Sequence, residues 1–132
     1  MNAHIKIINN KIYNVNKDCI VLKRIHVKQC EIAKNDILKN NGSGIHLSEV
    51  RAESNDPNKV SIRNNQITEI FNNPGIYLEN ASVSLEHNEI RKNISHGIYI
   101  ASTSSNHTNN HIIIMNCSVQ ENGGSGMEVV DF

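Results

Sequence analysis

Carboxylates are the side chains of this 132-residue chain that could perform acid–base chemistry. Asp36 and Glu89 each follow an asparagine at equivalent positions of a repeated pattern, and glycan-cleaving enzymes use pairs of such groups. If successive copies lie at the spacing of β-strands, these two carboxylates are about 10 Å apart, slightly beyond the separation of an inverting pair. The equivalent positions elsewhere hold Lys11, Gln66 and Ser118. We therefore interpret this column as a mixed, solvated strip and predict no catalytic residue.

Histidine and cysteine are the other residue types that could do chemistry. Among the histidines only His107 and His111 have the i, i+4 spacing of a metal site, and that spacing converges only on a helix. Their segment is rich in Asn and Ser and does not favour a helix. Cys19, Cys30 and Cys117 form no CxxC pair, so we interpret them as buried, reduced thiols. The sequence predicts no metal site and no cofactor.

Aromatic side chains provide the best candidate for a binding site. The repeated pattern places His46, Tyr77 and Tyr99 at the same outward position of successive copies, with Val21 before them and Glu128 after them. Aromatic rings offer an apolar face and a polar tip, which suits a sugar ring or a protein partner. The alternative is cross-strand pairing that only stabilises the sheet. We predict His46, Tyr77 and Tyr99 as binding residues.

A repeat must position all these candidates. An aliphatic residue is followed three places later by Asn or Cys, then by a second aliphatic residue, and seven or eight residues further by Gly-aliphatic-x-aliphatic. The pattern occurs four times, with a degenerate copy in front, and its Asn or Cys positions are 25, 30, 23 and 29 residues apart. Such a period is typical of solenoids. The first aliphatic residues, which should stack in one interior column, are Ile7, Ile32, Ile62, Leu85 and Ile114.

The local pattern within each repeat predicts strands and corners. Segments such as 60–62 and 83–85 alternate apolar with small or polar residues, which is typical of β-strands, and no stretch has a sustained helical period. Asparagine tolerates left-handed backbone angles and hydrogen-bonds nearby backbone, so we expect it at corners, stacked in a ladder. The Gly positions should serve tight bends. The predicted ladder consists of Asn10, Asn35, Asn65, Asn88 and Cys117.

These motifs carry a resemblance. The pattern Ile62-x-x-Asn65-x-Ile67 followed by Gly75-Ile76-x-Leu78 resembles the right-handed parallel β-helix of the pectate-lyase-like superfamily. It is similar in particular to modules of the NosD type, to carbohydrate-binding and sugar-hydrolase repeats, and to the β-helices of some F-box and SHC-binding proteins. The resemblance covers roughly residues 5–131 and implies right-handed winding.

The family's catalytic elements do not carry over to this chain. His96-Gly97 is similar to part of the Gly-His-Gly element of polygalacturonases, but Ser95 stands where the first glycine belongs. The paired aspartates and the Arg-Ile-Lys element are missing. We therefore expect an all-β, single-stranded right-handed parallel β-helix of about five rungs, forming one domain over residues 1–132, with no catalytic residue.

Composition narrows the classes of partner. Thirteen basic and thirteen acidic residues cancel, which argues against nucleic acid and against a membrane surface as partners. The N-terminus has no signal-peptide core, so we expect a cytoplasmic protein. Two polar stretches, 48–59 and 101–111, are predicted to be loops.

The ends of the solenoid carry the main functional expectation. A solenoid without caps exposes unpaired strand edges and core residues. We expect the chain to belong to a longer solenoid or to an assembly, and to act as a non-catalytic scaffold that binds a protein partner or itself through its ends. The alternatives are a carbohydrate-binding or carbohydrate-active β-helix, and a segment of a larger enzyme. The expected end residues are Ile5, Ile7, Ile8, Met127, Val130 and Phe132.

Overall fold

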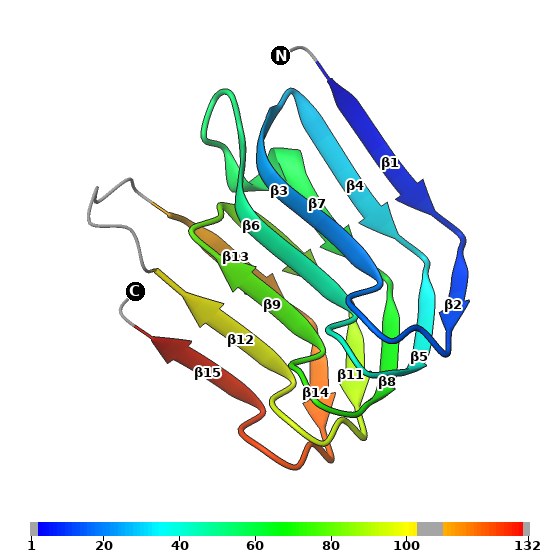
Figure 1. Cartoon of the computed structure of the whole chain (residues 1–132). Coiled ribbons are helices and arrows are strands. Elements are labelled where there is room, and N and C mark those ends of the chain that lie inside the picture. The colour runs from blue at the N-terminus through cyan, green and yellow to red at the C-terminus, as the bar shows by residue number, and fades with distance from the viewer. Residues whose placement is uncertain (1–2, 103–109, 131–132) are drawn as a thin grey trace.

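The computed structural model describes residues 3–102 and 110–130, and these residues form three parallel sheets of five strands each (Figure 1). The first sheet holds β1 (His4–Ile8), β4 (Gln29–Ala33), β7 (Val60–Arg63), β10 (Val83–Glu86) and β13 (Ile112–Met115). The second holds β2 (Lys11–Tyr13), β5 (Asp36–Asn40), β8 (Gln66–Ile70), β11 (Glu89–Arg91) and β14 (Ser118–Gln120). The third holds β3 (Ile20–Val27), β6 (Ile45–Ala52), β9 (Ile76–Glu79), β12 (Ile98–Ala101) and β15 (Met127–Val130).

Each set of three consecutive strands makes one coil of a solenoid. Coil 1 holds β1–β3, coil 2 holds β4–β6, coil 3 holds β7–β9, coil 4 holds β10–β12 and coil 5 holds β13–β15. Figure 1 shows the coils stacked from coil 1, in blue, to coil 5, in orange and red. Every strand pairs in parallel with its equivalents in the adjacent coils, so coils 1 and 5 form the two edges of all three sheets. The predicted β-helix of about five rungs is confirmed.

Aliphatic columns fill the space between the sheets. The strand register aligns Ile7 with Ile32, Ile32 with Ile62, Ile62 with Leu85, and Leu85 with Ile114. Ile32, Ile62 and Leu85 are completely buried, whereas the equivalent residues of coils 1 and 5 are only partly buried. The predicted interior column is therefore confirmed.

Residues of many types, rather than the ladder asparagines, adopt the left-handed backbone. The residue before each ladder position has a positive φ, for example Lys34 (57°), Asn64 (56°) and His87 (54°). A second set lies five residues later, for example Lys39 and Glu69 (both 57°). The prediction that the ladder asparagines themselves supply left-handed angles was wrong. The ladder asparagines point their amides inward instead, where they replace missing backbone hydrogen bonds at the corner.

Glycine stands at the Gly positions of the repeat for a different reason from the tight bends that we expected. None of the glycines has a positive φ. A Cβ at Gly44 would lie 2.8 Å from Ile67 Cγ2 and 2.9 Å from Gly75 O. Glycine is needed there because the backbone lies against the core and the next coil, which leaves no room for a side chain.

The connections also differ in part from expectation. Residues 48–52 continue strand β6 and pair with coil 1, so only the rest of the predicted loop 48–59 protrudes, and it includes a short 3-10 turn, Pro57–Lys59. Most of the predicted loop 101–111 lies outside the described residues, as does His107. No helix within 3–102 and 110–130 is long and apolar enough to cross a membrane.

Candidate binding surface

The predicted aromatic residues lie side by side on the outer face of the third sheet. Strand register places His46 opposite Tyr77 and Tyr77 opposite Tyr99. The ring centroids are 4.5 Å apart for His46 and Tyr77 and 5.2 Å apart for Tyr77 and Tyr99, with interplanar angles of 36° and 53°. Val21 precedes this row and Glu128 follows it. We call His46, Tyr77 and Tyr99 the aromatic stripe.

A carboxylate orients the histidine at the coil 1 side of the stripe. Asp18 Oδ2 lies 2.8 Å from His46 Nδ1, and Asp18 Oδ1 accepts a hydrogen bond from the Ser43 N–H at 2.7 Å. Because an ionised carboxylate only accepts, His46 carries its proton on Nδ1. The imidazole is thereby held against the ring of Tyr77.

A second histidine lies at the other side of the stripe and contacts a carboxylate through its other ring nitrogen. The His96 ring lies 5.8 Å from Tyr99, and its Nε2 lies 2.8 Å from Glu128 Oε2. Its Nδ1 accepts a hydrogen bond from the Ser125 N–H at 2.9 Å, so the proton is on Nε2. The four rings thus form one continuous row between two carboxylates.

A third carboxylate lies beside the middle of the stripe. Glu79 accepts a hydrogen bond from the Tyr77 hydroxyl at 3.3 Å and another from the Ser48 hydroxyl at 3.0 Å. Burial raises the pKa of the Tyr77 hydroxyl above its ordinary value, and the nearby Glu79 charge raises it further. Tyr77 therefore stays protonated and keeps a polar tip beside an apolar ring.

This surface offers groups that can make binding contacts. Rings in a fixed row with adjacent carboxylates can contact a sugar, an apolar side chain or a cation. Asp18, His96 and Glu79 were not among the predicted site residues. Asp18 and His96 both stand directly before the Gly or Cys position of their repeats, and Glu79 aligns with Ser48 and Ala101, but the residue type at these positions changes from coil to coil and gave no recurring signal. Asp18 meets His46 because 28 residues of chain complete one coil between them.

The column of Asp36 and Glu89 also lies on the surface as predicted. Gln66 separates the two carboxylates in the second sheet, because it pairs with both. Within the described ranges, no three His, Cys, Asp or Glu side chains lie close enough together to hold a metal ion. His111 uses its backbone N–H to donate to Ser82 Oγ at 3.0 Å.

The predicted ladder residues lie in one interior column. Asn10 Nδ2 donates to Asn35 Oδ1, Asn35 Nδ2 to Asn65 Oδ1 and Asn65 Nδ2 to Asn88 Oδ1, each at 3.0 Å. Asn88 Nδ2 lies 3.7 Å from Cys117 Sγ. The Asn35 and Asn65 amides also donate to backbone carbonyls of the preceding coil. These residues are structural, because their polar groups satisfy one another and the backbone.

A second amide column was not predicted. It lies five residues after the ladder and consists of Val15, Asn40, Ile70, Asn93 and Asn122. Asn93 Nδ2 donates to Asn122 Oδ1 at 3.0 Å, and the Ile70 N–H donates to Asn93 Oδ1 at 2.8 Å. The recurrence of Asn at the fifth place after the ladder was the available signal, which Val15 and Ile70 interrupt.

The three cysteines are free thiols. Burial raises the pKa of Cys30 to about 11, with a smaller contribution from the charge of Glu31. Burial raises the pKa of Cys19 to about 11 as well, and the Asp18 charge adds to it. Thiolate is the reactive form, so neither thiol has the character of a catalytic nucleophile at neutral pH.

Comparison with known proteins agrees with this architecture. The family model described as the right-handed beta helix region matches residues 1–132. No curated protein and no solved structure shows significant similarity to the chain. With five parallel coils, three sheets and a family match over its whole length, the chain belongs to the right-handed β-helix family.

Proposed function

We propose that this chain is a non-catalytic β-helix module that serves as a scaffold for protein contacts, and that it makes these contacts through its terminal coils. The observation that carries the proposal is the exposure of interior positions at both ends. Met127 and Val129 align with the buried Ile98 and Ile100, yet they are 44% and 51% exposed. Contiguous apolar surface of this kind usually marks an interaction site.

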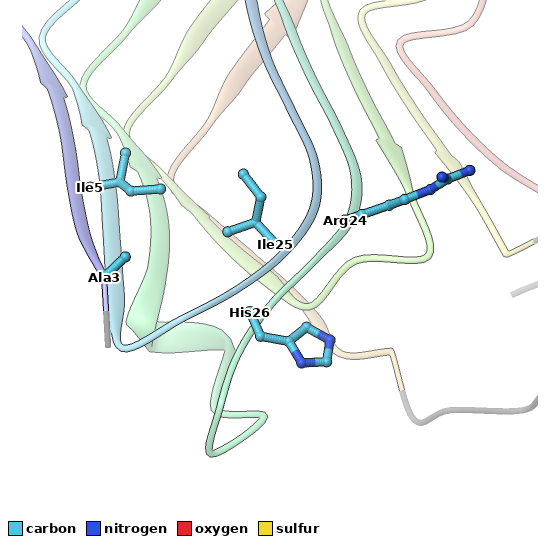
Figure 2. Close-up of a pocket in the computed structure, with 5 residues that line it drawn as sticks. All are labelled: Ala3, Ile5, Arg24, Ile25 and His26. Carbon is cyan, nitrogen blue, oxygen red and sulfur yellow. The ribbon is translucent and has the colours of Figure 1, made fainter. Parts of the chain in front are cut away.

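The outer end of coil 1 supports the same proposal. A hollow of about 390 Å³ is lined by Ala3, Ile5, Arg24, Ile25 and His26. Figure 2 shows Ile5 from β1 and Ile25 from β3 pointing toward one another, while Arg24 and His26 point away. A second hollow of about 440 Å³ is also lined only by coil 1, including Ile7, Ile12 and Ile20. Apolar side chains of a partner would fill both.

Two of the expected end residues do not contribute to these surfaces. Ile8 aligns through Ala33 with Arg63, and Val130 aligns with Ala101, which pairs with Glu79. Both columns contain charged side chains and lie on the outer face. Phe132 lies outside the described residues. The proposed contact surfaces are therefore the interior positions of coils 1 and 5.

Sedimentation velocity over a range of concentrations tests the proposal. Val129→Lys places a charge in the exposed interior column of coil 5, so association should weaken at least tenfold. Tyr77→Ala on the side wall is the control and should leave association unchanged. Association that survives Val129→Lys and is lost in Tyr77→Ala would contradict the proposal.

The non-catalytic part of the proposal has its own test. The purified chain should not cleave or epimerise pectate, alginate or related uronic polymers, with or without calcium. The support is the separation of Asp36 and Glu89 by Gln66, which keeps these two carboxylates from forming an adjacent pair. Reproducible turnover that disappears in Asp36→Asn or Glu89→Gln would show that the chain is an enzyme.

Carbohydrate binding is the second candidate function, and the aromatic stripe is the observation that favours it. Ring spacings of 4.5 and 5.2 Å follow the coil spacing and could match a linear glycan lying along the solenoid axis. Titration with uronic and neutral oligosaccharides, monitored by tyrosine fluorescence, tests it. Binding that is lost in Tyr77→Ala and Tyr99→Ala would favour this function.

We also propose a cytoplasmic setting. The support is chemical: Cys19, Cys30 and Cys117 are unpaired, as expected where disulfides do not form. Fractionation of cells that express the tagged protein would test the assignment, and recovery from the medium would contradict it.

A further inference from the structure

The charged residues are not distributed evenly along the solenoid. Coil 1 contains six basic residues and one acidic residue, Asp18, whereas coil 5 contains two acidic residues, Glu121 and Glu128, and no Lys or Arg. The segment between them is nearly balanced, with seven basic and nine acidic residues over 29–111. The basic residues of coil 1 are Lys6, Lys11, Lys17, Lys23, Arg24 and Lys28. A zero net charge for the whole chain therefore conceals one basic end and one acidic end.

We infer that a second copy of this chain docks head to tail, with the outer end of coil 5 of one molecule stacked on the outer end of coil 1 of the next. We call the coil 1 end the head and the coil 5 end the tail. This inference rests on the proposed function and specifies the partner and its orientation. Opposite charges favour head-to-tail contacts, and like charges disfavour the head-to-head and tail-to-tail alternatives.

The strand edges complement one another in this orientation. All three sheets end with coil 1 on one side and coil 5 on the other. Head-to-tail stacking would bring β13 beside β1, β14 beside β2 and β15 beside β3, and all three junctions would be parallel, as within the chain. Edge strands offer rows of N–H and C=O groups for such pairing. A head-to-head contact would bring the same edges together with reversed stacking.

The interior columns also continue across the junction. Register within the chain defines five apolar columns, whose coil 5 members are Ile112, Ile114, Val119, Met127 and Val129. Their coil 1 counterparts are Ile5, Ile7, Ile12, Ile20 and Leu22. Each exposed apolar residue of the tail would therefore meet an apolar residue of the head, as in the buried junctions between coils 2, 3 and 4.

The asparagine ladder would also extend across the junction. The Asn10 N–H donates to Asn35 Oδ1 and the Asn35 N–H to Asn65 Oδ1, both at 3.0 Å, so each coil donates to the next. By the same rule the Cys117 N–H would donate to Asn10 Oδ1 of the next copy. Because the contact joins different surfaces of identical molecules and does not close, the assembly should grow as an open chain.

The decisive experiment uses one variant blocked at each end. Val129→Lys blocks the tail, and Ile7→Lys blocks the head. Each variant alone should be a monomer, because each retains only one competent end. An equimolar mixture should form a 1:1 dimer that grows no further, since the two intact ends can meet once. Sedimentation velocity gives the masses, and circular dichroism establishes that both variants retain the β-helix.

Charge variants test the orientation independently. The double variant Lys11→Glu, Lys23→Glu should associate with itself at least tenfold more weakly than the wild-type chain in 50 mM salt. Lys34→Glu with Lys39→Glu, the same change in coil 2, is the matched control and should have a much smaller effect. Raising salt to 500 mM should weaken wild-type association several-fold, because the screening length falls from about 14 Å to about 4 Å.

Each possible result distinguishes this inference from the proposed function. A head-blocked variant that still dimerises associates tail to tail, and a tail-blocked variant that still dimerises associates head to head. Either result overturns the inference but leaves terminal contacts in place. A wild-type chain that stays monomeric at high concentration overturns the inference, while the binding of a different protein at the ends would still satisfy the proposed function.

Discussion

At the residue scale, the interior asparagine amide is the unit that makes each corner stable. Asn65 donates through Nδ2 to Asn88 Oδ1 and to Ile32 O, and its Oδ1 accepts from the N–H and Nδ2 of Asn35. Asn65 is 1% exposed, so these bonds are made away from water. An aliphatic side chain of similar size would leave several buried polar groups without partners, each at a cost of about 1–3 kcal/mol.

Replacement of Asn65 tests this role. Asn65→Leu should lower the free energy of unfolding by about 3 kcal/mol or more, because the Asn35 amide and the Ile32 carbonyl lose their partners. Asn73→Leu is the matched control, since Asn73 is exposed and its main bond is one contact to Asn41 O at 2.8 Å. Urea denaturation gives the free energy of unfolding of both variants. Equal midpoints would argue against a stabilising ladder.

In the second amide column, one substitution should add hydrogen bonds instead of removing them. Asn40 Nδ2 is buried and has no hydrogen-bond partner among the described residues, because Ile70 occupies the next place in its column. In Ile70→Asn the new Oδ1 could accept from Asn40, and the new Nδ2 could donate to Asn93 Oδ1. The free energy gained from these new hydrogen bonds should therefore offset much of what is lost with the buried apolar side chain of Ile70.

Comparison with an adjacent isoleucine measures this offset. Ile67 is equally buried but lies in an apolar column between Ile37 and Ile90. Ile67→Asn should destabilise the protein at least about 2 kcal/mol more than Ile70→Asn, since its amide would have no partner. Thermal or urea unfolding of the two variants gives the difference. Equal losses would mean that the second column does not accept a further amide.

At the element scale, the glycine that precedes β6, β9, β12 and β15 of the third sheet sets how closely the chain approaches the next coil. A Cβ at Gly97 would lie 2.5 Å from Val119 Cγ1 and 2.7 Å from Gly126 O. A Cβ at Gly126, the equivalent place in coil 5, would find its nearest atom at 3.7 Å. Glycine is therefore required at position 97 in coil 4, whereas position 126 in coil 5 has room for a larger side chain.

This contrast predicts different outcomes for one substitution. Gly97→Ala should destabilise the protein by about 1–3 kcal/mol, because the clashing carbonyl belongs to the backbone and cannot rotate away. Gly126→Ala should change stability by less than about 0.5 kcal/mol. Denaturant midpoints of the two variants provide the measurement. A stable Gly97→Ala variant would show that the coils can separate locally without cost.

The sequence predicted those elements whose residues repeat and missed those whose positions do not. Ile32 and Asn35 were identified because the same types recur at the same spacing in each coil. The left-handed corners were missed because Lys34 and His87, which adopt them, share no side-chain feature. The Asp18–His46 contact was missed because the residue types at its two positions change from coil to coil, although the same two positions are joined again by His96 and Glu128. Repetition determines the columns, whereas single contacts depend on the folded structure.

At the scale of the whole molecule, stability should vary along the solenoid axis. Each coil contacts only its neighbours, so coils 2, 3 and 4 are supported on both sides and coils 1 and 5 on one side. In such architectures stability is approximately a sum of coil terms and nearest-neighbour junction terms. The terminal coils therefore lack one junction each, which makes them the units most able to open locally.

Amide hydrogen exchange should reveal this gradient and connect it to assembly. At low concentration the amides around Ile62 in coil 3 should exchange at least tenfold more slowly than those around Ile7 and Ile114, because opening coil 3 breaks two junctions. At high concentration a head-to-tail contact would supply the missing junctions, so protection should rise in coils 1 and 5 and stay constant in coil 3. Val129→Lys should abolish that rise while preserving the slow exchange around Ile62. Uniform protection along the axis at every concentration would contradict both the nearest-neighbour description and the proposed stacking.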